Sequence, residues 1–228
     1  MVTQKGDNTS VVAIHGNFDD AQTGVKKIFA DRDFGEMLAG QGFQLSSANS
    51  INIGRLVPQV AYYVYAYGKL LEGGEIADGE MINVAVPTGN FGNILAAYFA
   101  KQMGVPIGKL ICASNDNKVL YDFFTTGTYD RNRDFILTNS PSMDILISSN
   151  LERLIYLSTG CDAKKTAGLM ADLAQKGSYE VTADMKERMA DFVGGFATQE
   201  EDAAAIRNLY EETGYVLDTH TGVACAVY

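Results

Sequence analysis

The segment that most constrains the fold is a strand-like run followed at once by a glycine-bracketed turn and a helix-like run. Residues 84–93 read VAVPTGNFGN and continue as ILAAYFAKQMG. This order predicts a strand over Met81–Val86, a turn between Gly89 and Gly92, and a helix over about Asn93–Met103. Glycines allow a tight turn with inward-facing N–H groups, and the first turn of a helix favours negative charge. The segment therefore predicts an anion-binding loop.

The loop matches neither of two widespread phosphate-binding motifs. GxxxxGK[ST] requires a lysine and a hydroxyl residue at the helix start, whereas Gly92 is followed by Asn93 and Ile94. GxGxxG requires three glycines, whereas this turn has only Gly89 and Gly92. On the residues alone, a phosphate loop and an ordinary turn between a strand and a helix both remain open.

Strand-like and helix-like runs alternate along the chain, which predicts an α/β fold. We expect a parallel β-sheet with flanking helices and a helical C-terminal portion. The expected strands are Ser10–Gly16, Met81–Val86 and Lys109–Ala113, with Tyr215–Leu217 as a candidate fourth. The expected helices are Ala21–Phe29, about Ser46–Leu71 with a kink or restart at Pro58, about Asn93–Met103, near Asn117–Thr125, about Ala163–Lys176, Ala183–Phe192, and a helix capped at Thr198 and ending near Glu212.

Composition and charge argue against several classes of protein. The chain has 228 residues, 46% of them hydrophobic, which suffices for one large domain or two small ones. A net charge of −10 argues against a general binder of nucleic acid or anionic membrane. The three cysteines are odd in number and far apart, so they suggest neither a disulfide framework nor a metal site. With no signal-peptide-like or membrane-length apolar run, we expect a soluble cytoplasmic protein without a metal.

Several blocks of the sequence resemble threonine synthase, a pyridoxal-phosphate enzyme of the tryptophan-synthase β-subunit class, called fold type II. The blocks follow the family's order over almost the whole chain: GNFDDAQ (16–22), LSSANSINIGRL (45–56), VPTGNFGN (86–93), SPSMDILISSNLERL (140–154) and DTHTGVA (218–224). The resemblance implies that residues 1–228 are part of the large, cofactor-phosphate-binding domain. The family's reaction is conversion of O-phospho-L-homoserine and water to L-threonine and phosphate.

The resemblance implies that the anion of the glycine loop is the phosphate of pyridoxal phosphate. The positions carried over, mainly through their backbone N–H groups, are Gly89, Asn90, Phe91, Gly92 and Asn93. In this fold class the pyridine nitrogen usually meets a hydroxyl near the C-terminus, which makes Thr221 the candidate. A turn or cap role for Thr221 is the alternative. The family pattern there reads DPHTA, from which Thr219 and Gly222 depart.

A polar segment at the start of the expected helix after residue 45 is the candidate substrate site. The residues that would hold a substrate phosphate or carboxylate are Ser47, Asn49, Ser50, Asn52 and Arg55. The alternative is a polar helix cap with Arg55 in solvent.

Two further groups of residues are expected to have supporting roles. We expect Ser142, Met143 and Asp144 to line or brace the site. Asn17, Asp19 and Asp20 are expected to cap a helix rather than to form a carboxylate pair.

No catalytic residue is assigned within the chain. The family's Schiff-base lysine belongs to an S-x-K-D motif that no lysine here matches, and the small domain is also missing. We therefore expect the C-terminal part of a threonine synthase that is inactive without its N-terminal half. An uncovered sheet edge or face would favour a homo-oligomer. A non-catalytic module that binds phosphate or pyridoxal phosphate, and one subunit of a split enzyme, remain as alternatives.

Overall fold

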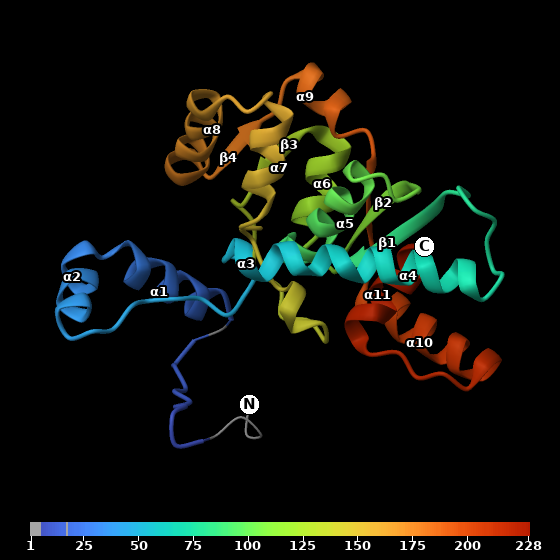
Figure 1. The fold of residues 1–228 in the computed structure, drawn as a ribbon, viewed down its shortest axis with the longest axis horizontal. Coiled ribbons are helices and arrows are strands. Elements are labelled where there is room, and N and C mark those ends of the chain that lie inside the picture. Colours follow the sequence, from blue (N-terminus) through green and yellow to red (C-terminus); the bar gives the residue numbers. More distant parts are fainter. Residues whose placement is uncertain (1–5, 17) are drawn as a thin grey trace. The chain divides into compact units, whose positions relative to one another are not determined.

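A computed structural model describes residues 6–16 and 18–228, and the chain divides into two units, Met1–Leu45 and Ser46–Tyr228 (Figure 1). The first unit contains helices α1 (Phe18–Ala30) and α2 (Arg32–Gly40). Asp31 caps α2, because its Oδ1 accepts a hydrogen bond from Phe34 N at 2.9 Å. The expected helix over Ala21–Phe29 is confirmed. The capping role of Asn17 and of the Asp19 side chain lies outside the described residues.

The expected strand over Ser10–Gly16 is wrong. The segment has no regular secondary structure, and the Val12 and Ile14 side chains are 81% and 52% exposed. The bridge in the described part of this region joins Gly6 to Thr9 instead. A strand needs a neighbour to pair its backbone groups and a surface to bury its side chains. Among the described residues, no neighbouring strand pairs with this segment.

The second unit is built on a parallel sheet of strands β1 (Ile82–Pro87), β2 (Ile107–Ser114) and β5 (Phe192–Phe196), in the order β1-β2-β5. Both neighbouring pairs are parallel. Helix α5 (Gly92–Gln102) connects β1 to β2, as the sequence predicted. The α/β class with a parallel sheet and flanking helices is confirmed.

Strand β5 replaces the end of an expected helix. We predicted a helix over Ala183–Phe192, but α9 covers only Ala183–Arg188. An added Cβ on Gly194 would lie 3.1 Å from Tyr121 Cα, and one on Gly195 would lie 2.3 Å from Val227 Cγ1. Adjacent residues of a strand face opposite sides of a sheet, so helices close in on β5 from both faces. The two glycines are therefore needed for close packing, although they look like turn residues in the sequence.

The other elements of the second unit mostly follow the expected pattern. They are α3 (Ile53–Leu56), the 3-10 helix η2 (Val57–Gln59), α4 (Val60–Glu72), α6 (Val119–Thr126), β3 (Thr128–Asp130), the 3-10 helix η3 (Pro141–Met143), α7 (Leu151–Ser158), α8 (Ala163–Lys176), β4 (Ser178–Glu180), α10 (Gln199–Thr213) and α11 (Thr219–Val227). The interruption at Pro58 is confirmed, because η2 separates α3 from α4, but the helix expected from about Ser46 begins only at Ile53, where Asn52 caps it.

The C-terminal region confirms one prediction and corrects another. Thr198 forms the expected capping box with Glu201, whose N donates to Thr198 Oγ1 at 3.2 Å and whose Oε2 accepts from Thr198 N at 2.8 Å. Tyr215–Leu217 is not a strand but an irregular link between α10 and α11. Its Tyr215 and Val216 side chains are exposed, so the segment gains no burial that would favour a strand.

The core of this unit fixes where the glycine loop lies. Ile94, Leu95, Ala96 and Ala97 of α5 are wholly buried in the main hydrophobic cluster. A smaller cluster packs α11 against the other side of the sheet and contains Ala113, Met143, Ala197, Val223 and Ala224. The carboxyl ends of parallel strands meet at one edge, and the turn between β1 and α5 lies at that edge.

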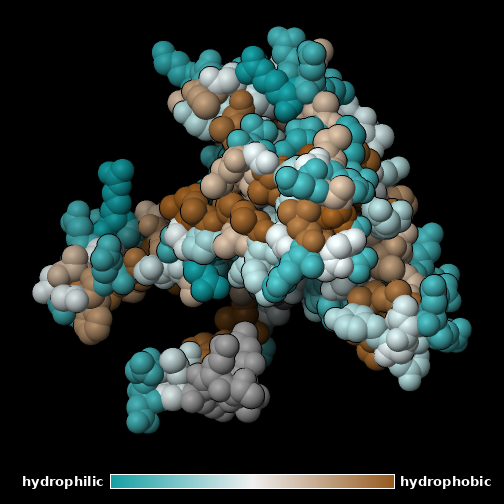
Figure 2. Space-filling view, turned by 45° about the vertical axis from the view of Figure 1, so that its right-hand side comes forward, coloured by the Kyte–Doolittle hydropathy of each residue, from teal (hydrophilic) through white to brown (hydrophobic). Residues whose placement is uncertain are grey.

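Some apolar side chains remain on the surface of the second unit. Ile53, Val57 and Val64, on α3, η2 and α4, are 50%, 51% and 48% exposed. Figure 2 shows hydrophobic areas lying between hydrophilic ones on the face that it presents. Of the helices that the structure describes, none combines the length and apolar character needed to cross a bilayer.

Candidate functional site

The glycine loop runs from the end of β1 into α5 and contains an unusual backbone conformation. Phe91, the N-cap residue of α5, has a φ of 63°, in the left-handed region. Its ring is buried and lies 5.5 Å from the Phe192 ring and 6.0 Å from the Phe124 ring, measured between centroids. Aromatic packing therefore holds a residue in a conformation that usually favours glycine.

The carbonyl groups of the loop are all bound to protein. Gly89 O accepts a hydrogen bond from Ser148 Oγ at 2.7 Å. Asn90 O accepts from both Asn150 N at 3.1 Å and Asn150 Nδ2 at 2.9 Å. Phe91 O accepts from Leu95 N at 3.1 Å, within the first turn of α5. The loop is thereby anchored through its acceptors.

The N–H groups of the same loop are left open. Within the described part of the chain, the main-chain N–H groups of residues 89–94 have no hydrogen-bond acceptor. Such consecutive donors at the positive end of a helix dipole form a concave binding site for an anion. This arrangement matches the chemistry of a phosphate group better than that of an ordinary turn.

The two glycines of the loop serve close packing rather than a left-handed backbone. An added Cβ on Gly89 would lie 2.5 Å from Ser142 O, and one on Gly92 would lie 2.5 Å from Ser50 Oγ. Among the loop residues, all of which the structure describes, only Phe91 has a positive φ. The sequence singled out both glycines for a tight turn, whereas the structure shows neighbouring segments approaching the loop closely at both positions.

Asn93 uses its side chain for support. Its Nδ2 donates to Gln59 Oε1 at 3.0 Å, and its Oδ1 accepts from the Tyr63 hydroxyl at 2.5 Å. Burial raises the pKa of that Tyr63 hydroxyl, which therefore remains a donor. Asn93 thus offers an anion its N–H group and not its side chain.

The polar segment before α3 is partly a helix cap. Asn52 Oδ1 accepts from Gly54 N at 2.9 Å, and Asn49 Oδ1 accepts from Ser47 Oγ at 2.7 Å and Ile51 N at 3.1 Å. Those side chains are occupied within their own turn, as the capping alternative expected. Ser50 instead faces the glycine loop through its contact with Gly92.

Arg55 differs from the other candidate substrate residues. Its side chain is exposed and has no hydrogen-bond or ion-pair partner among the residues that the structure describes. A guanidinium group without a partner can receive a phosphate or carboxylate in two parallel hydrogen bonds. The Arg55 side chain is therefore solvated, as the capping alternative expected, and its guanidinium group is available to bind an anion.

The segment 138–150 braces the loop, and a buried carboxylate organises this segment. Asp144 Oδ1 accepts from Thr138 Oγ1 at 2.7 Å, Asn115 Nδ2 at 2.8 Å and Asn117 Nδ2 at 3.1 Å. Its Oδ2 accepts from Thr138 N at 3.0 Å. Asp144 thus joins the end of β2 to the segment whose Ser142 backbone packs against Gly89.

Several of these bracing residues were not singled out from the sequence. They are Asn115, Asn117, Thr138, Ser148 and Asn150. Asn115 and Asn117 follow the carboxyl end of β2, a position where α/β proteins commonly bind ligands, so strand order alone was a usable signal.

Thr221 lies in the first turn of α11, close to the segment 138–150. Its hydroxyl donates to Asp218 Oδ2 at 2.6 Å, and its neighbour His220 accepts from Ser142 N through Nε2 at 3.2 Å. The hydrogen bond from the Thr221 hydroxyl, together with the backbone N–H groups of Thr221 and His220, lowers the pKa of Asp218 to about 2, although partial burial acts to raise it. Asp218 is therefore a carboxylate that caps α11 and fixes the Thr221 hydroxyl proton.

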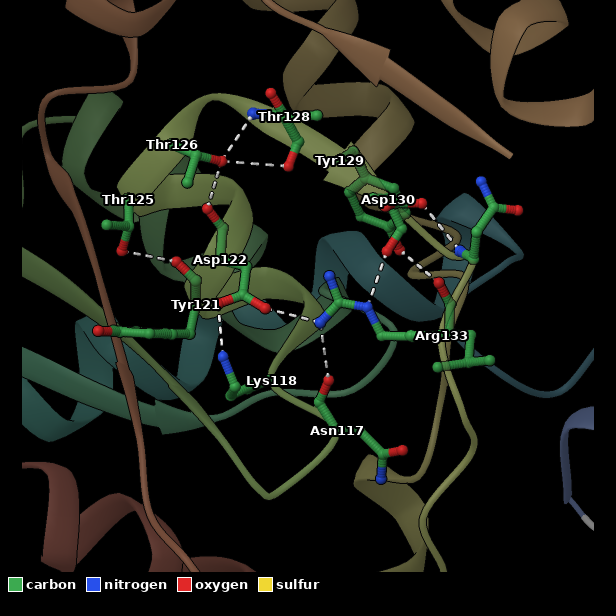
Figure 3. Close-up of polar contacts among 12 residues, drawn as sticks. Asn117, Lys118, Tyr121, Asp122, Thr125, Thr126, Thr128, Tyr129, Asp130 and Arg133 are labelled. Carbon is green, nitrogen blue, oxygen red and sulfur yellow. Dashed lines mark hydrogen bonds and ion pairs between the residues drawn. The ribbon is translucent and has the colours of Figure 1, made fainter. Parts of the chain in front are cut away.

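Helix α6 and the segment after β3 carry an ion-pair cluster that Figure 3 shows in detail. Asp122 lies between Lys118 Nζ at 2.8 Å and Arg133 at 2.6 Å. Partial burial acts to raise the pKa of Asp122, but the two cations hold it below its usual value. Both cations are already paired, so they fix the start of α6 and do not form a free anion site.

The residues present fit a phosphate-bearing cofactor. The open N–H groups of residues 89–94 supply its donors, and the buried Ser114 hydroxyl on the adjacent strand has no partner among the described residues. Within those same residues, no group of three His, Cys, Asp or Glu side chains is placed to hold a metal ion.

Comparison with known proteins shows extensive similarity to one family. A human protein named threonine synthase-like 1 is 46% identical over 230 residues, covering 100% of this chain and 31% of the human protein. Threonine synthase of Saccharomyces cerevisiae is 37% identical over 241 residues, covering 99% of this chain and 45% of the yeast protein. No protein-family model matches the chain.

Solved structures agree with these sequence relatives. The crystal structure of threonine synthase with bound pyridoxal phosphate from Brucella melitensis aligns with a TM-score of 0.82 and 42% identity. The alignment covers 94% of this chain and 44% of that chain. The chain spans less than half the length of each of these relatives.

Proposed function

Because this chain is homologous to a portion of the threonine synthases, we propose that it is the cofactor-phosphate-binding part of such an enzyme. The complete enzyme would convert O-phospho-L-homoserine and water to L-threonine and phosphate. In this proposal, residues 1–228 belong to the C-terminal, large-domain part. The observation that carries the proposal is the run of open N–H groups at residues 89–94.

The glycine loop would hold the phosphate of pyridoxal phosphate. Its carbonyl groups are bound to Ser148, Asn150 and the first turn of α5, so the N–H groups are directed by a fixed framework. The positive end of the α5 dipole adds to the attraction for a dianion. When bound, pyridoxal phosphate supplies an electron sink for the substrate.

Thr221 would face the pyridine nitrogen of the cofactor. Its hydroxyl donates to Asp218 Oδ2 in this structure, and it would rotate to donate to the pyridine nitrogen, which is an acceptor when unprotonated. The contact of His220 with Ser142, whose carbonyl packs at Gly89, supports an arrangement in which the start of α11 and the glycine loop serve one ligand.

The segment around Ser50 and Arg55 would bind the substrate. Ser50 contacts the glycine loop at Gly92, and Arg55 has an unpaired guanidinium group in the described structure. Arg55 would hold the phosphate or carboxylate of O-phospho-L-homoserine, and Ser47, Asn49 and Asn52 would keep the turn in shape.

The lysine that binds the cofactor covalently would come from outside residues 1–228. No lysine here lies in the family's motif, and some are committed elsewhere: Lys101 binds Gly108 O and Asp191, and Lys118 binds Asp122. The chain alone would therefore be inactive. The exposed apolar residues of α3 to α4 would contact the remaining part of the enzyme or a second copy, and the enzyme would work in the cytoplasm.

The test compares two ligands that differ only in the phosphate. We expect pyridoxine 5′-phosphate to bind the chain saturably in calorimetry, and pyridoxine to bind much more weakly. Borohydride treatment with pyridoxal phosphate should leave no single lysine modified stoichiometrically, as read by intact mass. Equal affinity for the two ligands would refute the phosphate-loop assignment.

A second assay separates a part of an enzyme from a binding module. The chain is mixed with the separately produced remaining portion of a homologous threonine synthase, and phosphate release from O-phospho-L-homoserine is measured. Activity only in the mixture supports the enzyme proposal. Saturable binding of pyridoxine 5′-phosphate without activity in the mixture favours the non-catalytic module.

A further inference from the structure

Asn150 connects the two regions that the proposed function assigns to cofactor and substrate. Its Nδ2 donates to Asn90 O in the glycine loop at 2.9 Å and to Ser50 Oγ at 3.2 Å. Ser50 belongs to the candidate substrate turn, residues 47–55. Its backbone N also donates to Asn90 O, at 3.1 Å. One buried amide group therefore touches both segments, which lie about 40 residues apart in the sequence.

Arg153 holds this amide in position. Its Nε donates to Asn150 Oδ1 at 3.3 Å, and its Nη2 donates to Ile51 O at 2.9 Å. The half-buried guanidinium group thereby orients Asn150 and reaches the substrate turn itself. Because Asn150 Oδ1 is fixed as an acceptor, its Nδ2 is directed toward Asn90 and Ser50.

The glycine loop leaves little freedom at this junction. An added Cβ on Gly92 would lie 2.6 Å from Ser50 Cβ and 3.4 Å from Asn150 Nδ2. A shift of the substrate turn would therefore press on the first residue of α5, whose N–H group belongs to the open donor set. The two segments are packed and hydrogen-bonded as one unit.

We propose that Asn150, oriented by Arg153, is a positioning residue that couples anion binding at the glycine loop to anion binding at the substrate turn. The inference rests on the proposed function and deepens it. Occupation of one subsite orders the shared junction, so the second ligand has less conformational freedom to remove. Coupling of this kind is reciprocal, and its usual range begins at about fivefold in affinity.

The test measures both affinities on the chain itself. The dissociation constant of O-phospho-L-homoserine is determined by calorimetry with and without saturating pyridoxine 5′-phosphate, which lacks the reactive aldehyde. We expect it to fall at least about fivefold in the wild type when the second ligand is present. The Asn150→Leu variant keeps the side-chain shape and the backbone N–H bond to Asn90. For this variant, the ratio of the dissociation constant without pyridoxine 5′-phosphate to that with it should approach one.

Ser149→Ala is the matched control. Ser149 Oγ donates to Asn90 Oδ1 at 3.1 Å but has no bond to the substrate turn, so its loss loosens the loop without cutting the junction. This variant should keep the wild-type ratio. A ratio near one in the wild type, or an unchanged ratio in Asn150→Leu, would overturn the coupling while leaving the proposed function intact. Absence of binding by both ligands would overturn the proposed function and the coupling together.

A measurement without ligand keeps the inference testable if affinities are weak. In hydrogen exchange, Asn150→Leu should speed exchange in both 46–56 and 86–95, whereas Ser149→Ala should affect 86–95 alone. Faster exchange over the entire second unit would indicate general destabilisation and count against a specific coupling role. Arg153→Lys, which retains a donor to Ile51 O, should partly preserve the ligand ratio.

Discussion

Replacing Gly89 with alanine tests whether close packing, rather than backbone conformation, explains this glycine. Gly89 does not have a positive φ, so alanine can adopt its backbone conformation. The added Cβ, however, would lie 2.5 Å from Ser142 O and 3.4 Å from Met143 Cα. Both neighbours are backbone atoms, which cannot move aside as a flexible side chain can.

The expected cost follows from two opposing effects. Extra atoms in a packed region usually cost about 1–3 kcal/mol in unfolding free energy. Replacement of glycine restricts the unfolded chain and returns about 0.4–1 kcal/mol. The difference lies between about 0 and 2.6 kcal/mol, and the contact with rigid backbone favours the upper half, so Gly89→Ala should destabilise the second unit by about 1–2.6 kcal/mol. The displaced Ser142 segment should also disturb the loop and weaken binding of pyridoxine 5′-phosphate.

Urea unfolding followed by circular dichroism measures the stability change. The matched control is Gly168→Ala within α8, where an added Cβ would meet nothing within 4 Å. That control should stabilise the protein by up to about 1 kcal/mol and leave phosphate affinity unchanged. If Gly89→Ala is as stable as the wild type and binds the ligand equally well, the packing explanation is wrong.

Two substitutions and one labelling experiment test other parts of the structure. Asp144→Ala should cost about 3 kcal/mol in urea unfolding, because it removes the charged acceptor that Asn115, Asn117 and Thr138 share in a buried network; a loss below about 1 kcal/mol would contradict this reasoning. A thiol reagent should label Cys161 and Cys225 but not Cys112 until the protein unfolds, because burial raises the Cys112 pKa to about 12; rapid labelling of all three would show that Cys112 is accessible. The low pKa of Asp218 stabilises the folded chain above the ordinary value of 3.8, and this contribution is lost as pH falls through about 2. Thr221→Val should raise that pKa in an NMR titration, and an unchanged pKa would argue against the hydroxyl bond.

Local sequence patterns predicted the elements that depend on local chemistry. The strand and helix around the glycine loop, the interruption at Pro58 and the capping box at Thr198 all occur where they were expected. Apolar periodicity, proline geometry and cap residues act over a few neighbours, so one sequence is enough to read them.

The errors arose where distant parts of the chain decide the outcome. Ser10–Gly16 has the composition of a strand but no neighbouring strand among the described residues. The helix predicted over Ala183–Phe192 ends at Arg188, and Phe192 instead pairs with Leu110 of β2 as the first residue of β5. Neither outcome is encoded in the spacing of nearby residues.

The candidate site divides in the same way. The glycine loop was visible as a motif, whereas its supports at Ser148 and Asn150 lie about 60 residues further along the chain. The roles of Thr221 and Arg55 toward a ligand stay predictions until binding is measured.

The left-handed conformation of Phe91 has a consequence for how quickly and tightly an anion can be held. A non-glycine residue in this region costs about 1–3 kcal/mol, and the burial of its ring among Phe124 and Phe192 offsets that cost during folding. The N–H groups therefore stand in their binding arrangement before any ligand arrives. The site is preorganised, so association needs little rearrangement of the backbone, and the hydrophobic core contributes to affinity without touching the ligand.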